Sequence, residues 1–254
     1  MNPPISAKAA LLLVVGLAIV IAVALLEPIP QDPLYHQFSD ARRLAELPNF
    51  VNVLSNLPFL LVGTLGIRYV ITHDGALTQN TKLAWLIFFF GIALTAFGSG
   101  YYHLHPDNDS LVWDRLPMTI GFMSLVAIII AAYHSPSLGR KLLPLLLIVG
   151  FSSVMYWSHT ETLGRGDLRP YVIVQFLPIV LIPLVISLYR SRSALGRYLW
   201  WMIGFYVASK IAEFYDANIY DVGGIISGHS VKHLIAALAP ASLLLGLTQR
   251  KIDR

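Results

Sequence analysis

Residues 83–103 read LAWLIFFFGIALTAFGSGYYH, a long apolar stretch that contains no Lys, Arg, Asp or Glu and ends in a histidine. A transmembrane helix needs roughly 20 such residues to cross the hydrocarbon core of a bilayer. The stretch therefore predicts a membrane-spanning helix that brings His103 to one face of the membrane.

The composition of the whole chain agrees with this interpretation. Apolar residues make up 56% of the 254 residues and charged residues only 13%, and the mean hydropathy is +0.65. Ordinary soluble domains are far more polar. The absence of cysteine excludes disulfides, thiolate metal ligands and a cysteine nucleophile. The net charge of +4 does not predict a nucleic-acid partner, because the basic residues are spread over many loops.

Seven further apolar stretches accompany the first. The eight lie at about residues 9–26, 50–71, 83–102, 116–133, 142–158, 171–189, 198–213 and 230–247. We therefore predict an all-α integral membrane protein, a seven-transmembrane-helix bundle with one additional N-terminal transmembrane helix. Residues 1–31 would form that helix or signal anchor, and residues 32–254 the seven-helix domain. A cleaved signal peptide is the alternative for the first stretch, because Lys8 precedes an apolar run that reaches Ala22-Val23-Ala24.

The distribution of charge predicts an orientation. If eight helices alternate in direction, most Lys and Arg residues fall on one side and most acidic residues on the other. Loops rich in Lys and Arg stay in the cytoplasm. We therefore expect a multi-pass protein of the plasma (inner) membrane with both termini cytoplasmic, and with His103, Asp114 and His229 near the outer face.

Two histidines open the last apolar stretch, in His229-Ser230-Val231-Lys232-His233. Residues four apart project from one face of a helix, so both imidazoles can reach a single ion. His233 should lie about one turn inside the apolar zone, where ionisable groups are costly and tend to be functional. A hydrogen-bonded histidine pair without a metal is the alternative interpretation.

A second polar group ends the third stretch. Ser99 and His103 are also four residues apart, and Asp114 follows eleven residues after His103, past a short acidic turn. Asp114 can thus face His103 across a tight helical hairpin. Each has a structural alternative: Ser99 could allow close helix packing, and Asp114 could be a helix N-cap. Their convergence with the histidine pair at one membrane face favours a metal site.

The combination Ser-x3-His, an aspartate eleven residues later and a closing His-x3-His resembles the alkaline ceramidase family. That family belongs to a group of seven-helix membrane hydrolases that includes the adiponectin and progestin receptors. The resemblance covers roughly residues 49–247, and Phe50, Asn52, Ser55 and Asn56 also match the family's first core helix.

The resemblance implies that His103, His229 and His233 bind Zn²⁺, that Asp114 is the general base and proton shuttle, and that Ser99 helps to hold the substrate carbonyl. It implies hydrolysis of the amide bond of a ceramide-like membrane lipid to a fatty acid and a sphingoid-type amine. The family's calcium pattern is not matched, because Asn49 stands where the ceramidases carry a glutamate. Ser230, Val231 and Lys232 replace residues that tend to be aromatic in those enzymes.

Two other functions stay open on the sequence alone. A lipid receptor or sensor could keep the metal site without turnover. A transporter could use Lys210, Glu213 and the histidines as an ion or proton relay. Lys210 and Glu213 lie three residues apart, and a membrane-buried ion pair is the simplest interpretation. Asn49, Asn52 and Asn56 fall on one face of their helix, which we expect to face the bundle interior.

Overall fold

The computed structural model describes residues 6–73, 75, 78, 80–189 and 195–249. Within these residues the chain is helical and forms no strand; Leu44 and Leu47 make a single isolated bridge. The elements are α1 (Ala7–Ala24), η1 (Pro33–His36), α2 (Phe50–Leu54), α3 (Leu57–Thr72), α4 (Lys82–Leu104), α5 (Asn108–Tyr133), α6 (Pro136–Thr162), α7 (Arg169–Leu188), α8 (Gly196–Phe214), α9 (Asp216–Gly223) and α10 (Gly228–Gln249).

Each predicted apolar stretch corresponds to a helix or, for residues 50–71, to the consecutive helices α2 and α3. Seven segments of the described chain are long and apolar enough to cross a membrane, with α2 and α3 counted as one. This is the pattern of a multi-pass membrane protein. The predicted span over residues 198–213 is the helix α8, but α8 is not among the seven. It carries Arg197, Lys210 and Glu213, which lower its hydropathy.

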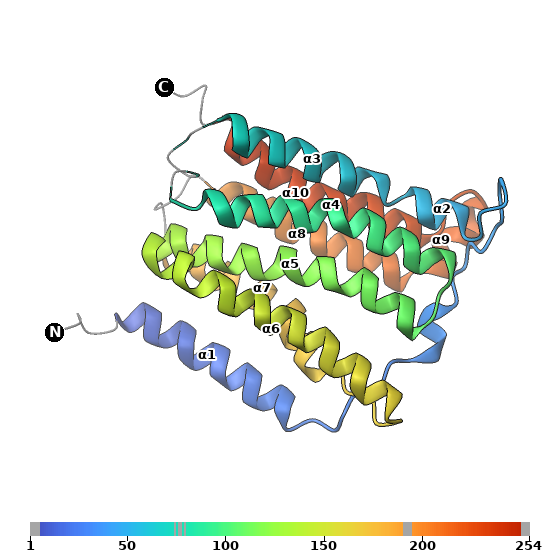
Figure 1. The fold of residues 1–254 in the computed structure, drawn as a ribbon, viewed down its shortest axis with the longest axis horizontal. Helices are drawn as coiled ribbons and strands as arrows, with labels where there is room; N and C mark the ends of the chain where they lie inside the picture. The colour runs from blue at the N-terminus through green and yellow to red at the C-terminus, as the bar shows by residue number, and fades with distance from the viewer. Residues whose placement is uncertain (1–5, 74, 76–77, 79, 190–194, 250–254) are drawn as a thin grey trace.

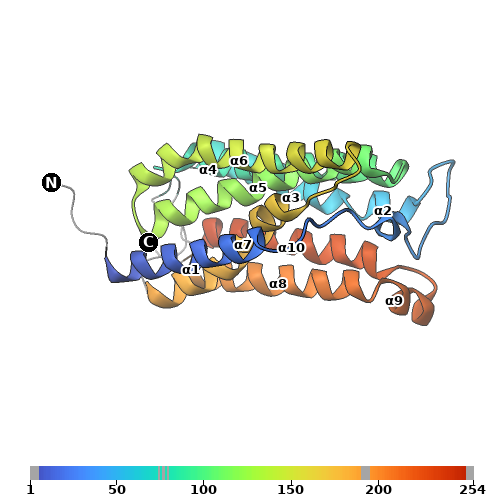
Figure 2. The ribbon, with the colours of Figure 1, turned by 90° about the horizontal axis from the view of Figure 1, so that it is seen from below.

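The long helices run roughly parallel or antiparallel in one elongated bundle (Figure 1). Helices α4 and α5 pack along their length, as do α5 and α6, and α10 packs on both α8 and α3. Helix α1 contacts α7 at the edge of the bundle and buries none of its residues (Figure 2). The bundle without α1 therefore contains the whole core, as expected for an additional N-terminal helix.

Two helices begin earlier than predicted, and their caps explain why. Asp107 and Ser110 form a capping box that starts α5 at Asn108 instead of about residue 116. Ser135 caps α6 and Pro136 occupies its first turn, so α6 starts before residue 142. As a result Pro117, next to the predicted start, lies inside α5.

The interior divides into two apolar clusters. The larger one fills the middle of the bundle with aromatic and aliphatic side chains of α4, α5, α8 and α10, among them Trp85, Phe89, Ile128, Leu199 and Leu243. The smaller cluster lies near the junction of α4 and α5 and includes Tyr102, Leu111 and Trp157. The functional side chains described next lie in and around this second region.

Candidate active site

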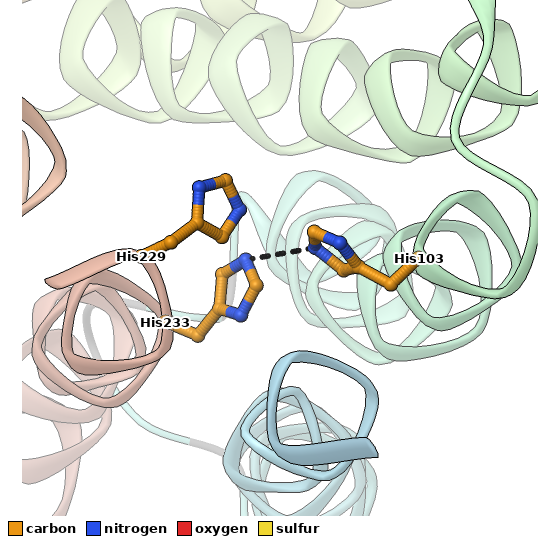
Figure 3. A group of neighbouring side chains, drawn as sticks. All are labelled: His103, His229 and His233. Atoms are coloured by element: carbon orange, nitrogen blue, oxygen red, sulfur yellow. Dashed lines mark hydrogen bonds between the residues drawn. The ribbon is translucent and has the colours of Figure 1, made fainter. Parts of the chain in front are cut away.

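The three predicted metal ligands meet inside the bundle. His103 comes from the last turn of α4, and His229 and His233 from the first two turns of α10. All three are buried, and one ring nitrogen of each lies within 4.8 Å of those of the other two. Figure 3 shows the rings gathered between the two helices. The prediction that helices distant in sequence bring these imidazoles together is confirmed.

The start of α10 is fixed by polar contacts. The Asp216 carboxylate, at the start of α9, accepts the backbone N–H of His229 at 2.6 Å. The Ser230 hydroxyl donates to Oδ1 of Asn52 at 2.6 Å, and the Asn52 amide donates to the carbonyl of Asp40. Ser230 thus ties α10 to α2, which sets the direction in which both histidines point.

Ser55, at the C-terminal end of α2, contacts His233 and bears on the tautomer of its ring. The Ser55 hydroxyl has one proton, which it donates to the carbonyl of Asn52 at 2.9 Å. With its proton on that carbonyl, Ser55 accepts from Nδ1 of His233 at 2.7 Å, which matches one of the two tautomers of the ring. The proton of His233 then sits on Nδ1, and Nε2 keeps its lone pair for a metal.

His103 presents a matching nitrogen. Its Nε2 lies 3.4 Å from Nε2 of His233. Two nitrogens bound to one tetrahedral zinc ion lie about 3.3 Å apart when Zn–N bonds are about 2.0 to 2.1 Å. Nδ1 of His103 is buried without a hydrogen-bond partner, and Asn49 donates its amide to the His103 carbonyl at 2.8 Å. The spacing of this pair is one that a metal ion could bridge, and a nitrogen of His229 lies within 4.8 Å of both.

The segment before α2 covers these rings. The Phe38 ring centroid lies 4.6 Å from the centroids of both His103 and His229. Sequence reasoning missed Phe38, because nothing in its local pattern indicates its contact with the histidines.

In the same segment, the Arg42 guanidinium hydrogen-bonds Asp40 and holds the pKa of that carboxyl below its usual value. The interaction keeps Asp40 ionised at neutral pH, although its side chain is almost completely buried.

A chain of charged side chains adjoins His229. The predicted pair is present, with Nζ of Lys210 2.7 Å from Glu213. A second lysine joins it: Nζ of Lys232 lies 2.9 Å from the other oxygen of Glu213 and 3.0 Å from Nε2 of His229. Lys232 is one helical turn after His229, so the spacing could have indicated this contact. The Glu213 carboxylate therefore pairs with the ammonium groups of both lysines.

Ser99 and Asp114 face each other across α4 and α5. Both side chains line the same cavity. The two helices approach closely there because Gly98 has no Cβ, which would collide with the carbonyl of Trp113. Asp107 is the N-cap of α5, and Asp114 lies nearly two turns inside the helix. The alternative of Asp114 as an N-cap is therefore wrong.

Both residues line an internal cavity of about 450 Å³. His233 lines it as well, so the cavity reaches the histidine cluster. Much of its wall is apolar and comes from the middle of the bundle, with Phe59, Phe88, Ile92, Leu125, Met202 and Pro240 among the lining residues. The polar and charged lining includes Asn56, Ser99, Asp114, Arg115, Lys210, Glu213 and Lys232. Such a cavity can hold an apolar chain with a polar group beside the histidines.

The asparagines of the first core segment face the interior as predicted. Asn49, Asn52 and Asn56 are all buried. The first two link helices and loops by hydrogen bonds, as described above, and Asn56 lines the cavity. Two of the asparagines thus link parts of the chain by hydrogen bonds, and the third lines the cavity.

Comparison with known proteins adds the family. The model of the ceramidase family matches residues 42–215. The matched part contains Ser99, His103 and Asp114 but ends before α10, so the match does not include His229 and His233. No curated protein matches the chain. Since the family match covers more than half of the sequence, the chain belongs to the ceramidase family.

Proposed function

We propose that this protein is a zinc-dependent membrane hydrolase that cleaves the amide bond of a ceramide-like lipid and releases a fatty acid and a sphingoid-type amine. The observation that carries the proposal is that one cavity is lined by His233 of the three-histidine cluster, by the Ser99–Asp114 pair and by a long apolar wall. Family membership supports amide hydrolysis as the reaction class.

His103, His229 and His233 would hold the zinc ion. When bound, zinc lowers the pKa of a coordinated water to about 7 and polarises a substrate carbonyl. The Ser55 contact leaves Nε2 of His233 unprotonated for this role. Three neutral ligands leave the ion its full charge, which suits a catalytic rather than a purely structural site.

Asp114 would act as the general base and proton shuttle. Its carboxylate takes a proton from the attacking water and delivers it to the nitrogen of the leaving amine, so the C–N bond breaks as a C–O bond forms. Ser99, which lines the same cavity, would hold the substrate carbonyl oxygen by a hydrogen bond from its hydroxyl. The apolar wall would bind the acyl chain.

We further propose the membrane arrangement that the charge distribution favours. Residues 1–31 would be an N-terminal transmembrane helix or signal anchor, and residues 32–254 the hydrolase domain. Both termini would be cytoplasmic in the plasma (inner) membrane, and the histidines would lie near the outer face. Lipid would enter from the bilayer between helices.

The test uses the purified full chain in detergent. We expect about one zinc per chain by metal analysis and release of fatty acid from ceramide. Asp114→Asn should reduce the rate by at least 10²-fold, because general acid–base catalysis typically contributes 10²–10⁴-fold, while zinc is retained. Asp109→Asn is the matched control, because Asp109 is exposed in the first turn of the same helix.

Two results would contradict the proposal. If zinc is retained but no lipid amide is hydrolysed across a broad panel, the protein is a receptor or sensor instead. Ion flux in liposomes that persists after zinc removal would favour the transporter.

A further inference from the structure

Arg115 follows Asp114 directly and precedes the apolar stretch predicted from about residue 116, which would leave it in a loop. It lies inside α5 instead, 6% exposed, because the capping box starts this helix early. Its side chain lines the same cavity as Asp114 and His233. The chain thus places a permanently charged group beside the proposed general base.

The contacts of this guanidinium do not neutralise its charge. Nη2 donates to the side-chain oxygen of Gln31 at 2.6 Å. The guanidinium carbon lies 4.1 Å from the ring centroid of Trp157 and 4.8 Å from that of Tyr171. Nη1 is buried without any hydrogen-bond partner. Among the described residues, no carboxylate lies within ion-pair distance of Arg115.

The other charged residues that line the cavity also leave the charge of Arg115 without a counter-ion. Its buried or partly buried lining carries three cations, Arg115, Lys210 and Lys232, but only two carboxylates. Glu213 is shared between the two lysines. Asp114 is the other. A third lining carboxylate, Asp32, is exposed and accepts the backbone N–H of Leu34. The buried wall therefore has a surplus of positive charge even before a divalent metal binds.

We propose that Arg115 binds a carboxylate on the amine portion of the substrate, so that among amide lipids of one chain type the protein favours those with such an acidic group, as in N-acyl amino acids, over their uncharged carboxamide counterparts. A planar guanidinium with an unused N–H group suits a carboxylate, and burial strengthens the interaction. This inference rests on the proposed amide hydrolysis. In that reaction water and N-acylglycine give a fatty acid and glycine, with the shuttled proton ending on the glycine nitrogen.

The experiment compares N-palmitoylglycine with N-palmitoylglycinamide, which differ only in the negative charge. The wild-type protein should show a kcat/KM at least tenfold higher for the acid. Arg115→Gln should abolish this preference, mainly through a ten- to hundredfold higher KM for the acid, because hydrogen bonds to charged groups are among the strongest. Arg115→Lys should retain part of the preference, since it keeps the charge. Arg43→Gln is the control, because Arg43 is exposed and pairs with Glu46.

A structural role predicts a different result. If Arg115 only anchors Gln31 and the aromatic rings, Arg115→Gln will lower kcat/KM for both lipids by the same factor, which would overturn the proposal. A wild-type protein without any preference would overturn it too. Should Arg115→Gln fail to fold, Arg115→Lys decides by its ratio of kcat/KM for the acid to kcat/KM for the amide. A ratio below that of the wild type supports the proposal, and an unchanged ratio contradicts it. A weakened inhibition by palmitate with an unchanged substrate preference would assign the guanidinium to the released fatty acid and also contradict the proposal.

A binding measurement separates this inference from the proposed hydrolysis. Radiolabelled N-palmitoylglycine is bound to the Asp114→Asn protein, and the unlabelled acid and amide compete for it. Preferential competition by the acid that is lost with Arg115→Gln supports the acidic-group site even if no lipid is hydrolysed. Equal competition by both lipids counts against that site even if ceramide is cleaved.

Discussion

Single hydrogen bonds decide how the histidines present their nitrogens. Ser55 has only one proton and gives it to a backbone carbonyl, which leaves it as an acceptor for His233. In that arrangement Nδ1 of His233 carries the proton and Nε2 is free. Neighbours of this kind orient metal ligands, and their loss typically costs 10- to 100-fold in metal affinity.

Ser55→Ala should therefore weaken zinc binding by 10- to 100-fold while the protein remains folded. The affinity is measured by competition with a coloured chelator, and folding by circular dichroism. Ser124→Ala is the control, because Ser124 is also buried but its hydroxyl has no hydrogen-bond partner. An unchanged zinc affinity in Ser55→Ala would show that His233 is oriented by other contacts.

At the scale of helices, the distance between α4 and α5 sets the geometry of the site. Gly98 lets the backbone of α4 touch the carbonyl of Trp113 on α5. This contact lies one residue before Ser99 on α4 and one residue before Asp114 on α5. The closeness of the two helix segments that carry these side chains therefore depends on the absence of a Cβ at Gly98.

Gly98→Ala should force α4 and α5 apart and destabilise the protein by about 1–3 kcal/mol, the usual cost of overpacking. It should also lower hydrolysis more than stability alone explains, because Ser99 and Asp114 separate. Thermal unfolding in detergent and fatty-acid release check the two effects. Gly204→Ala is the matched control, since nothing lies within 4 Å of a Cβ at that position of α8. Equal behaviour of the two variants would contradict the predicted contact.

The existence of each long helix could be predicted from the sequence. Where a helix ends, and which helices it packs against, could not. Apolar runs gave all the long helices because a bilayer demands about 20 apolar residues. The start of α5 was wrong because the capping box of Asp107 and Ser110 lies in a polar stretch that hydropathy treats as a loop. The same error placed Arg115 at the surface.

The candidate site could likewise be predicted only in part. Spacing within one helix predicted the His229–His233 pair and the Lys210–Glu213 pair, since residues three or four apart share a face. Contacts between helices depend on how the helices are rotated and shifted against each other, which no local pattern records. Ser55 beside His233 and Phe38 over the imidazoles are such contacts.

At the scale of the whole molecule, the histidine cluster joins the first and last core helices. The cluster and its hydrogen-bonded neighbours include Asn52 and Ser55 near the start of the core, His103 at the end of α4, and His229 and His233 at the start of the last helix. A ligand that binds only the folded state stabilises it in proportion to the logarithm of its concentration. The proposed zinc ion should therefore stabilise the entire bundle.

Removal of zinc should lower the melting temperature, and free zinc at 100 times Kd should restore about 2.7 kcal/mol of stability. The measurement is thermal unfolding at several buffered zinc concentrations. The variant His233→Ala should lose this concentration dependence, whereas His159→Ala, in the last turn of α6, should keep it. A melting temperature that does not respond to zinc would contradict a metal site that links both ends of the core.

The late position of α10 has a consequence for biosynthesis. A ribosome delivers Ser99, His103 and Asp114 long before it reaches His229, so the growing chain offers a metal only one of the three imidazoles. Loading of the proposed ion would have to wait until α10 has docked against α3 and α8. The proposed hydrolase would thus stay inert during its own assembly, with the ion bound as a closing step of maturation.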